Sequence, residues 1–191
     1  MNGFVKFAVF AVLGAALGYF PALYLAEGNA FSGAVRAGQW TVWPNAGGVG
    51  ATPYSRLHFF LSGQLPPSHF NRLDFETSRD EAGRALDAAC DYLLEGPAPP
   101  VRWWALSIYP EDGGASGAGG NVTEISSFDA ITGKNGAVRI HISALARPGN
   151  WIKPPAEGKM TLALRLFNAG ALSRETLLAH APVKVMRETC R

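Results

Sequence analysis

The sequence has few cysteines, and its charges are sparse and nearly balanced. The 191-residue chain contains 2 cysteines, Cys90 and Cys190, which are too few for a zinc ribbon or a disulfide-dense miniprotein. Lysine and arginine total 17 and aspartate and glutamate total 15, so the formal net charge is only +2. A protein that neutralises a nucleic-acid backbone needs a dense basic stripe. We therefore expect no nucleic-acid partner.

Short catalytic and metal-binding motifs are also missing. A nucleophile elbow, G-x-S-x-G, holds its serine on a sharp strand-to-helix turn, but the run GASGA around Ser116 lacks the last glycine. No HExxH or other short ligand spacing joins the histidines, which are His58, His69, His141 and His180. We therefore expect neither a metal site nor a cofactor.

Acidic residues form two close pairs in the sequence, Asp87 with Asp91 and Glu111 with Asp112. Glycoside hydrolysis uses a pair of carboxylates that flank the scissile bond. Carboxylates at these spacings are more often solvated on the surface. For this reason we assign no catalytic residue from the sequence.

A long uncharged run stands near the N-terminus. Residues 7–26, FAVFAVLGAALGYFPALYLA, have the length of a helix of about 30 Å, which matches the hydrocarbon thickness of a bilayer. The competing interpretation is a cleaved signal peptide, which usually has a shorter apolar region before a small-x-small site. Tyr24 is too bulky for cleavage after Ala26. We favour an uncleaved transmembrane helix, with Pro21 kinking it or marking its exit.

The charges that flank this run predict its orientation. Lys6 precedes the run and Glu27 follows it, so the positive-inside rule places residues 1–6 in the cytoplasm. The C-terminal domain then lies in the periplasm of a single-pass inner, or cell, membrane protein. Gly14 and Gly18 form a small-xxx-small pair that allows close approach of a second helix. Passive anchoring is the alternative, because glycine is common in membrane helices.

The remaining sequence indicates strands separated by turns. Residues 27–50 are predicted to be an irregular lead-in with one short strand at 39–43, and 52–63 to be a helix capped by Thr52. The alternation of apolar and polar residues predicts strands at 102–109, 137–143 and 160–167. Turns are expected at 64–69 and 133–136, and a glycine-rich mobile loop at 111–121. Residues 80–95 fit both a helical and an alternating pattern, with a slight preference for helix.

Four passages resemble the family of domain of unknown function 1214. They are GQWTVWPNAG at 38–47, TPYSRLHFFLSG at 52–63, DEAGRALDAACDYLLEGPAPPVRWWALSIY at 80–109 and GNWIKPPAEGKMTLALRLF at 149–167. The resemblance implies an all-β, jelly-roll-like domain, often joined to or encoded beside a companion domain of unknown function family 1254, and no established reaction. It also implies a turn at 80–83 followed by a strand. The sequence departs from the family after LRLF, at residues 168–181.

The cysteines resemble those of a small membrane-anchored subgroup, with one cysteine before a tyrosine and one at the extreme C-terminus. Cys90 in Cys-Asp-Tyr and Cys190 fit this arrangement. In an oxidising compartment a disulfide between them would close a loop of about 100 residues. In the chain-entropy model this stabilises the folded state by up to about 4.7 kcal/mol. The alternative is two free thiols, one buried and one near the chain end.

Arginines and tryptophans form the most distinctive candidate binding surface. Arginine offers a planar fork of donors and tryptophan a large stacking area. The candidate residues are Arg102, Trp103, Trp104, Asn150, Trp151 and Arg165. The alternative is that these aromatic residues belong to the core and that the arginines are structural.

Taken together, the sequence predicts a mainly β protein. We expect a jelly-roll-like β-sandwich with one or two short helices, preceded by a single N-terminal transmembrane helix, and an exported domain spanning 51–191. The functional hypothesis is a bacterial envelope protein whose periplasmic domain binds a companion protein, such as one of family 1254, or a ligand. The alternative is a membrane-tethered enzyme acting on an envelope lipid, glycan or small amphiphile, and a third interpretation is stabilisation of a membrane complex through the helix.

Overall fold

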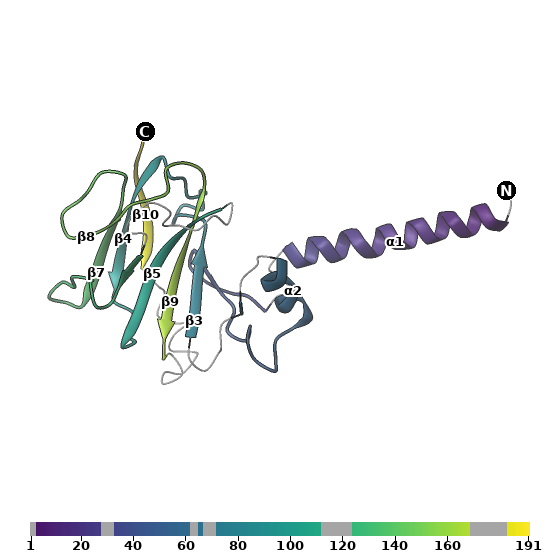
Figure 1. The fold of residues 1–191 in the computed structure, drawn as a ribbon, viewed down its shortest axis with the longest axis horizontal. Helices are drawn as coiled ribbons and strands as arrows, with labels where there is room; N and C mark the ends of the chain where they lie inside the picture. The colour runs from purple at the N-terminus through teal and green to yellow at the C-terminus, as the bar shows by residue number, and fades with distance from the viewer. Residues whose placement is uncertain (1–2, 28–32, 62–64, 67–71, 112–123, 169–182) are drawn as a thin grey trace. The chain divides into compact units, whose positions relative to one another are not determined.

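The computed structural model describes residues 3–27, 33–61, 65–66, 72–111, 124–168 and 183–191 (Figure 1). The chain divides into two compact units, one comprising Met1–Ala34 and Asn45–Pro66 and the other comprising Val35–Pro44 and Pro67–Arg191. The first unit holds both helices, and the second unit holds the β-structure.

The first unit contains α1 (Gly3–Glu27) and α2 (Pro53–Leu61). Helix α1 includes the predicted span and extends it at both ends, with Pro21 inside the helix. Its segment Gly3–Ala22 is long and apolar enough to cross a membrane, a property shared with signal sequences. Helix α2 begins as predicted, because the Thr52 hydroxyl oxygen accepts a hydrogen bond from the backbone N–H of Ser55 at 3.1 Å.

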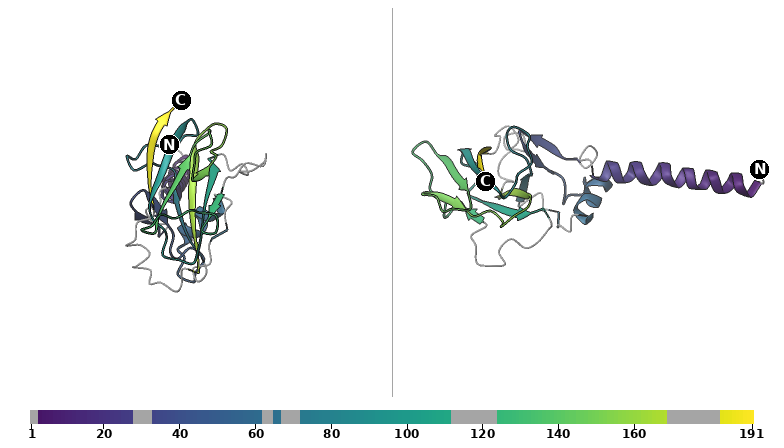
Figure 2. Two further views of the ribbon diagram at one scale, coloured as in Figure 1. Left: turned by 90° about the vertical axis from the view of Figure 1, so that its left-hand side faces the viewer. Right: turned by 90° about the horizontal axis from the view of Figure 1, so that it is seen from above.

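The second unit is a sandwich-like arrangement of two sheets, which confirms the predicted fold class. The six-stranded sheet has the order β1 (Val35–Ala37), β2 (Trp40–Val42), β3 (Arg72–Thr77), β9 (Met160–Phe167), β5 (Trp103–Pro110) and β6 (Glu124–Ser126). The four-stranded sheet has the order β10 (Lys184–Cys190), β4 (Cys90–Pro97), β7 (Ala137–Ile142) and β8 (Asn150–Ile152). Figures 1 and 2 show the two groups of strands from three directions.

Alternation explains why the predicted strands form. In β7 the buried residues Val138, Ile140 and Ile142 alternate with more exposed ones, so one face of the strand enters the core. Strand β9 pairs antiparallel with both β3 and β5, and β7 pairs antiparallel with β4 but parallel with β8. The segment 27–50 differs from the prediction in one respect: it contains two strands, β1 and β2, which join the edge of the larger sheet.

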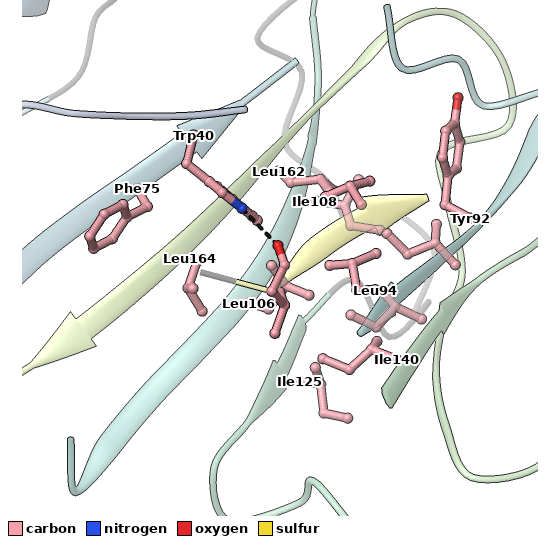
Figure 3. Packing of buried hydrophobic residues seen from close by; sticks show 14 of the residues in the cluster. Trp40, Phe75, Tyr92, Leu94, Leu106, Ile108, Ile125, Ile140, Leu162 and Leu164 are labelled. Atoms are coloured by element: carbon pink, nitrogen blue, oxygen red, sulfur yellow. Dashed lines mark hydrogen bonds between the residues drawn. The ribbon is translucent and has the colours of Figure 1, made fainter. Parts of the chain in front are cut away.

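The core lies between the two sheets (Figure 3). Trp40, Phe75, Leu106 and Leu164 come from the six-stranded sheet, and Ile140 comes from the four-stranded one. Complete burial of each such aliphatic or aromatic side chain contributes about 1.5–3 kcal/mol. The indole N–H of Trp40 donates to the backbone carbonyl of Val183 at 2.8 Å, which links β2 to the residue before β10.

Residues 80–95 form a turn and a strand, so the helical interpretation of this segment is wrong and the family-based one is confirmed. The backbone N–H of Arg84 donates to the Asp80 carboxylate at 2.9 Å, and Gly83 adopts a left-handed φ of 80° that ends any helical path. Strand β4 then pairs on one side with β10 and on the other with β7. These long-range pairings outweigh a local helical period.

A disulfide joins Cys90 to Cys190, which is the bridged alternative of the two that the sequence left open. It connects the start of β4 to the end of β10 across a sequence separation of 100 residues. Beside it, Asp91 forms ion pairs with Arg147 at 3.2 Å and with Arg191 at 2.7 Å. The C-terminus is therefore tied to β4 by a covalent bond and an ion pair.

Several expectations lie wholly or mainly outside the described residues. They concern the turn at 64–69, the glycine-rich loop after residue 111 and the segment 169–181. The turn at 133–136 is described and forms as predicted, with the backbone N–H of Gly136 donating to the carbonyl of Gly133 at 2.9 Å.

Candidate functional site

Charged and hydroxyl side chains gather on the face of the six-stranded sheet that points away from the core. Core residues alternate with them along β3, β9 and β5, and the register aligns Arg165 with Asp74 on one side and Ala105 on the other. We call this group the polar cluster. Its members are Asp74 and Glu76 on β3, Arg165 on β9, Ser107 and Tyr109 on β5, and Glu124 on β6.

Arg165 is the central residue of the polar cluster. Its guanidinium donates to the Ser107 hydroxyl at 3.2 Å and to the Tyr109 hydroxyl at 2.6 Å, and it lies 5.2 Å from the centroid of the Tyr109 ring. The Ser107 hydroxyl donates in turn to the Glu124 carboxylate at 2.6 Å. Arg165 is thus hydrogen-bonded directly to β5 and, through Ser107, is connected to Glu124 on β6, which holds these side chains in one arrangement.

The two carboxylates on β3 are hard to ionise. Burial raises the pKa of Asp74, against the opposing charges of Arg72 and Arg165 and a hydrogen bond from Arg72. Burial also raises the pKa of Glu76, the negative charge of Asp74 raises it further, and Arg165 opposes both effects. Asp74 has a close partner in Arg72, whose Nε lies 2.9 Å from its carboxylate. A carboxyl group whose pKa is raised by its surroundings is a candidate general acid or base.

Two surface hollows occur elsewhere on the described residues. One, of 280 Å³, is lined by Asp80, Glu81, Ala82, Arg84, Val185, Met186 and Arg187. The other, of 340 Å³, is lined by Pro110, Glu111, Glu157, Gly158 and Lys159. Neither includes a member of the polar cluster, and both are lined by charges that pair with one another, such as Arg84 with Asp80 at 2.8 Å and Lys159 with Glu111 at 3.8 Å.

The raised pKa of Glu76 predicts an effect on stability. Because the folded protein binds this proton more tightly than the unfolded chain does, stability falls as pH rises from the ordinary glutamate pKa through the raised one. We expect Glu76→Gln to increase the free energy of unfolding at pH 7 and to flatten its dependence on pH in the acid range. Chemical denaturation of the full chain in detergent from pH 4 to pH 8 measures both effects, within about 10–15%.

Asp80→Asn is a control with the opposite sign. Burial opposes ionisation of Asp80, but hydrogen bonds from Arg84 and the charges of Arg84 and Arg187 outweigh it and lower the pKa. Its contribution is therefore present above the ordinary aspartate pKa and is lost as pH falls through the lowered one. Asp80→Asn should reduce stability at pH 7. If Glu76→Gln also lost stability at pH 7, that result would contradict a raised pKa for Glu76 in the folded protein.

The structure places the predicted binding residues of the larger sheet in different environments. Trp103 is 40% exposed and stacks on Phe167, with ring centroids 4.0 Å apart. Its neighbour Trp104 is buried in the core, and Arg102 is exposed just before β5. Trp103 and Arg165 thus share the outer face of neighbouring strands, whereas Trp104 points inward.

Asn150 and Trp151 belong to β8 in the other sheet. The Asn150 amide is buried and bonds the backbone N–H of Ile131 at 2.7 Å, its carbonyl at 2.8 Å and the carbonyl of Arg139 at 2.8 Å. The indole N–H of Trp151 donates to the Ser143 carbonyl at 2.9 Å. Both residues therefore have structural hydrogen-bond partners. They belong to a different sheet from Trp103, so the predicted binding residues do not lie on one sheet.

The acidic pairs from the sequence have structural partners where they are described. Asp91 is held by two arginines, and the Asp87 carboxylate accepts from the backbone N–H of Ala89 at 2.9 Å. Asp112, Ser116, His69 and His180 lie outside the described residues. Within the described part of the chain, no three or more His, Cys, Asp and Glu side chains gather as a group that could hold a metal ion.

Sequence reasoning missed most of the polar cluster. It singled out Arg165, but not Asp74, Glu76, Ser107 or Tyr109. A signal was present, because Arg72, Asp74 and Glu76 alternate with Leu73, Phe75 and Thr77, the pattern of a strand with one charged face. The strands that lie beside β3 are set by the sheet order, and a local pattern of apolar and polar residues does not predict that order.

Comparison with known proteins gives a fold and a family profile. The structure of the VPA0106 protein from Vibrio parahaemolyticus is 19% identical, with a TM-score of 0.53, and the match covers 69% of this chain and 34% of that chain. An uncharacterised protein from Burkholderia cenocepacia is also 19% identical, with a TM-score of 0.40, over 64% of this chain and 30% of that one. The chain thus spans about a third of the length of these proteins. No curated protein matches it. The profile described as "Protein of unknown function (DUF1214)" matches residues 71–171.

Proposed function

Since the profile matches more than half of the chain, this protein belongs to the DUF1214 family, and we propose that it is a membrane-anchored module of the bacterial envelope. Its periplasmic sandwich binds a companion protein or a ligand in this proposal. The observation that carries it is α1, whose segment Gly3–Ala22 is long and apolar enough to span a bilayer and carries a single charge, Lys6. Residues 1–6 then face the cytoplasm.

The disulfide supports export of the sandwich. Disulfides persist in oxidising compartments such as the periplasm and are rare in the reducing cytosol. Cys90 and Cys190 are joined, and these are the only two cysteines in the sequence. A chain anchored by α1 with its N-terminus in the cytoplasm delivers both cysteines to the oxidising side of the membrane.

A binding role is supported by an exposed aromatic side chain beside the polar cluster. Trp103, an aromatic residue of the kind enriched at interaction surfaces, is exposed beside the polar cluster. In the Vibrio protein the shared fold is about a third of a longer chain, so there it is joined covalently to further sequence. We propose that this chain contacts its companion, such as a protein of family 1254, in the membrane, with Gly14 and Gly18 of α1 as one point of helix contact.

The second candidate function is a membrane-tethered enzyme acting on an envelope lipid, glycan or small amphiphile. The observation that favours it is the raised pKa of Asp74 and Glu76 beside Arg165 and Tyr109. Carboxyl groups with raised pKa values beside a guanidinium and a phenol are residue types that enzymes use as general acids and bases. The hollows described above lie elsewhere, which places this candidate second.

The test begins with extraction of the tagged full-length protein from native membranes in a mild detergent. We expect the chain to remain in the membrane after alkaline carbonate washing, with Met1 or Asn2 as its first residue, and to retain one companion protein in near-equal amount. Gly14→Leu with Gly18→Leu should reduce recovery of that companion, because a bulky side chain keeps helices apart. Ala16→Leu, on the opposite face of the same helix, is the matched control.

Each other outcome has a defined meaning. A soluble chain that begins near Glu27 would show a cleaved signal sequence and contradict the anchor. A membrane-bound chain that carries only a small molecule would favour the enzyme candidate, and Glu76→Gln would then be the first variant to assay.

A further inference from the structure

Large apolar side chains are exposed on the loop that follows β6 and on the neighbouring start of β5. Phe128 is 83% exposed, Ile131 is 67% exposed and Trp103 is 40% exposed, with Phe167 stacked on Trp103. The backbone N–H of Ser127 donates to the Trp104 carbonyl at 2.9 Å, so Phe128 and Trp103 are the next residues along two adjacent chain segments. We call Trp103, Phe128, Ile131 and Phe167 the apolar tip.

The loop that presents Phe128 and Ile131 is held firmly in place. The buried Asn150 amide bonds both the N–H and the carbonyl of Ile131, and the N–H of Ala130 donates to the Ser126 carbonyl at 2.9 Å. Ala130 and, on the neighbouring segment, Val101 pack against the core. The apolar side chains therefore stay exposed on a well-anchored loop. Large apolar side chains gathered in this way mark a surface that meets another apolar phase.

The segment between α1 and β1 is short enough to keep the sandwich close to any membrane that α1 spans. Residues 28–34 join α1 to β1, and a fully extended chain of this length reaches at most about 25 Å. If α1 spans a bilayer, the sandwich is confined to the layer next to that membrane. A membrane surface is therefore the partner at the highest effective concentration for any apolar surface on this domain.

The charges around the apolar tip suit lipid headgroups. Arg102 precedes Trp103 in the sequence and Lys134 follows Ile131, and both are exposed. The one acidic side chain within the loop, Asp129, accepts a hydrogen bond from the Ser126 hydroxyl at 2.6 Å. Tryptophan and phenylalanine favour the boundary between headgroups and acyl chains, and nearby basic side chains attract anionic lipids. Exposed aromatic side chains with basic side chains nearby in the sequence are typical of a shallow membrane contact.

We propose that the apolar tip inserts into the headgroup boundary of the membrane that holds α1. This inference rests on the proposed function, because it requires α1 to anchor the chain. The sandwich then has two membrane attachments: a permanent one through the helix and a reversible one through Trp103, Phe128 and Ile131. The second attachment fixes which face of the domain is turned towards the periplasm and which towards the lipid.

The test uses full-length protein reconstituted in vesicles of phosphatidylcholine and phosphatidylglycerol, with and without bromine-labelled acyl chains. Phe128→Trp adds a fluorescent reporter at the tip, and Leu145→Trp adds a matched one at a residue that is 73% exposed. Leu145 lies in the segment after β7, whereas Phe128 lies in the loop before it, so the two reporters stand on different connections of the sandwich. Brominated lipid should quench more than half of the fluorescence added by Phe128→Trp and little of that added by Leu145→Trp.

A second variant tests the tip without touching the core. Ile131→Asp placed in the Phe128→Trp protein should abolish the quenching, because a charge in the loop opposes entry into the acyl region. Flotation of the same samples after carbonate washing reports α1 separately. Protein that floats but shows equal quenching for the two reporters overturns the tip contact and leaves the anchor standing. Protein that does not float overturns the anchor, and a companion lost in Ile131→Asp without lipid quenching assigns the tip to a protein partner and overturns the inference.

Discussion

Replacing Cys90 and Cys190 together by serine is expected to lower the free energy of unfolding by up to about 4.7 kcal/mol in the chain-entropy model for a loop of this size. The bridge closes a sequence separation of 100 residues and joins the end of the edge strand β10 to the start of β4. Without it, the unfolded chain gains conformational freedom, and the end of β10 keeps only non-covalent ties to β4, namely the strand pairing and the ion pair of Arg191 with Asp91. Denaturant unfolding of the full chain in detergent measures the change.

Two comparisons separate the disulfide from other effects of the substitutions. Wild-type protein unfolded in a strong reductant should match the double serine variant, since both lack the bridge. Thr189→Ser, at the exposed neighbouring position on β10, should leave the unfolding free energy within about 0.5 kcal/mol of wild type. Equal stability of wild type and the serine variant under oxidising conditions would mean that the thiols are free in the native protein.

Trp40→Ala is expected to destabilise the sandwich by about 3–5 kcal/mol, the range for removing a large buried aromatic side chain. Trp40 is completely buried, at 0% exposure, and lies in the core beside Phe75 and Leu164 (Figure 3). The substitution also removes the indole N–H that bonds the Val183 carbonyl at 2.8 Å. That hydrogen bond joins segments 143 residues apart in sequence, so its loss loosens the segment that leads into β10.

Trp40→Phe distinguishes packing from hydrogen bonding. Phenylalanine keeps most of the apolar surface but cannot donate, while Gln39 still donates to the Val183 carbonyl at 3.3 Å. The expected loss is therefore smaller, about 1–3 kcal/mol. Val35→Ala on the edge strand β1, where the side chain is part-exposed, is the matched control with little effect. A loss below about 1 kcal/mol for Trp40→Ala would contradict a central place for this residue in the core.

Strong local patterns were sufficient for several elements. Residues 137–143 and 160–167 alternate without ambiguity, and β7 and β9 occupy these positions. The helix at 52–63 was predicted from its Thr52 cap and Pro53, and both features are present in α2. Each of these signals acts between residues close in sequence, so a window of the sequence contains all of the physical information needed.

Residues 80–95 show where a local pattern fails. Their apolar residues fit a helix slightly better than a strand, yet Tyr92 faces Ile142 on β7 and Arg187 on β10. Hydrogen bonds to two strands far away in sequence outweigh the small helix propensity of a few residues. The family resemblance predicted the strand because it carries information on tertiary pairing that periodicity does not contain.

The candidate surfaces illustrate the same limit. Arg102, Trp103 and Arg165 were identified by residue type, but Asn150 and Trp151, grouped with them, belong to the other sheet. The exposed Phe128 and Ile131 were missed, because each is a single apolar residue in a loop and loops show no period. The hydrogen bonds between Ser127 and Trp104 place Phe128 next to Trp103, and Asn150 holds Ile131 further along the same loop.

The sequence by itself determined the apolar N-terminal helix, the mainly β class, most strand positions and the family, because these depend on composition and on spacing along the chain. The tertiary structure decided the sheet order, the joining of Cys90 to Cys190, the polar cluster around Arg165 and the apolar tip. Each of these depends on which strands become neighbours. Neighbours are selected by burial of the whole core and by pairing across the chain, and the free energies of these processes are properties of the complete fold.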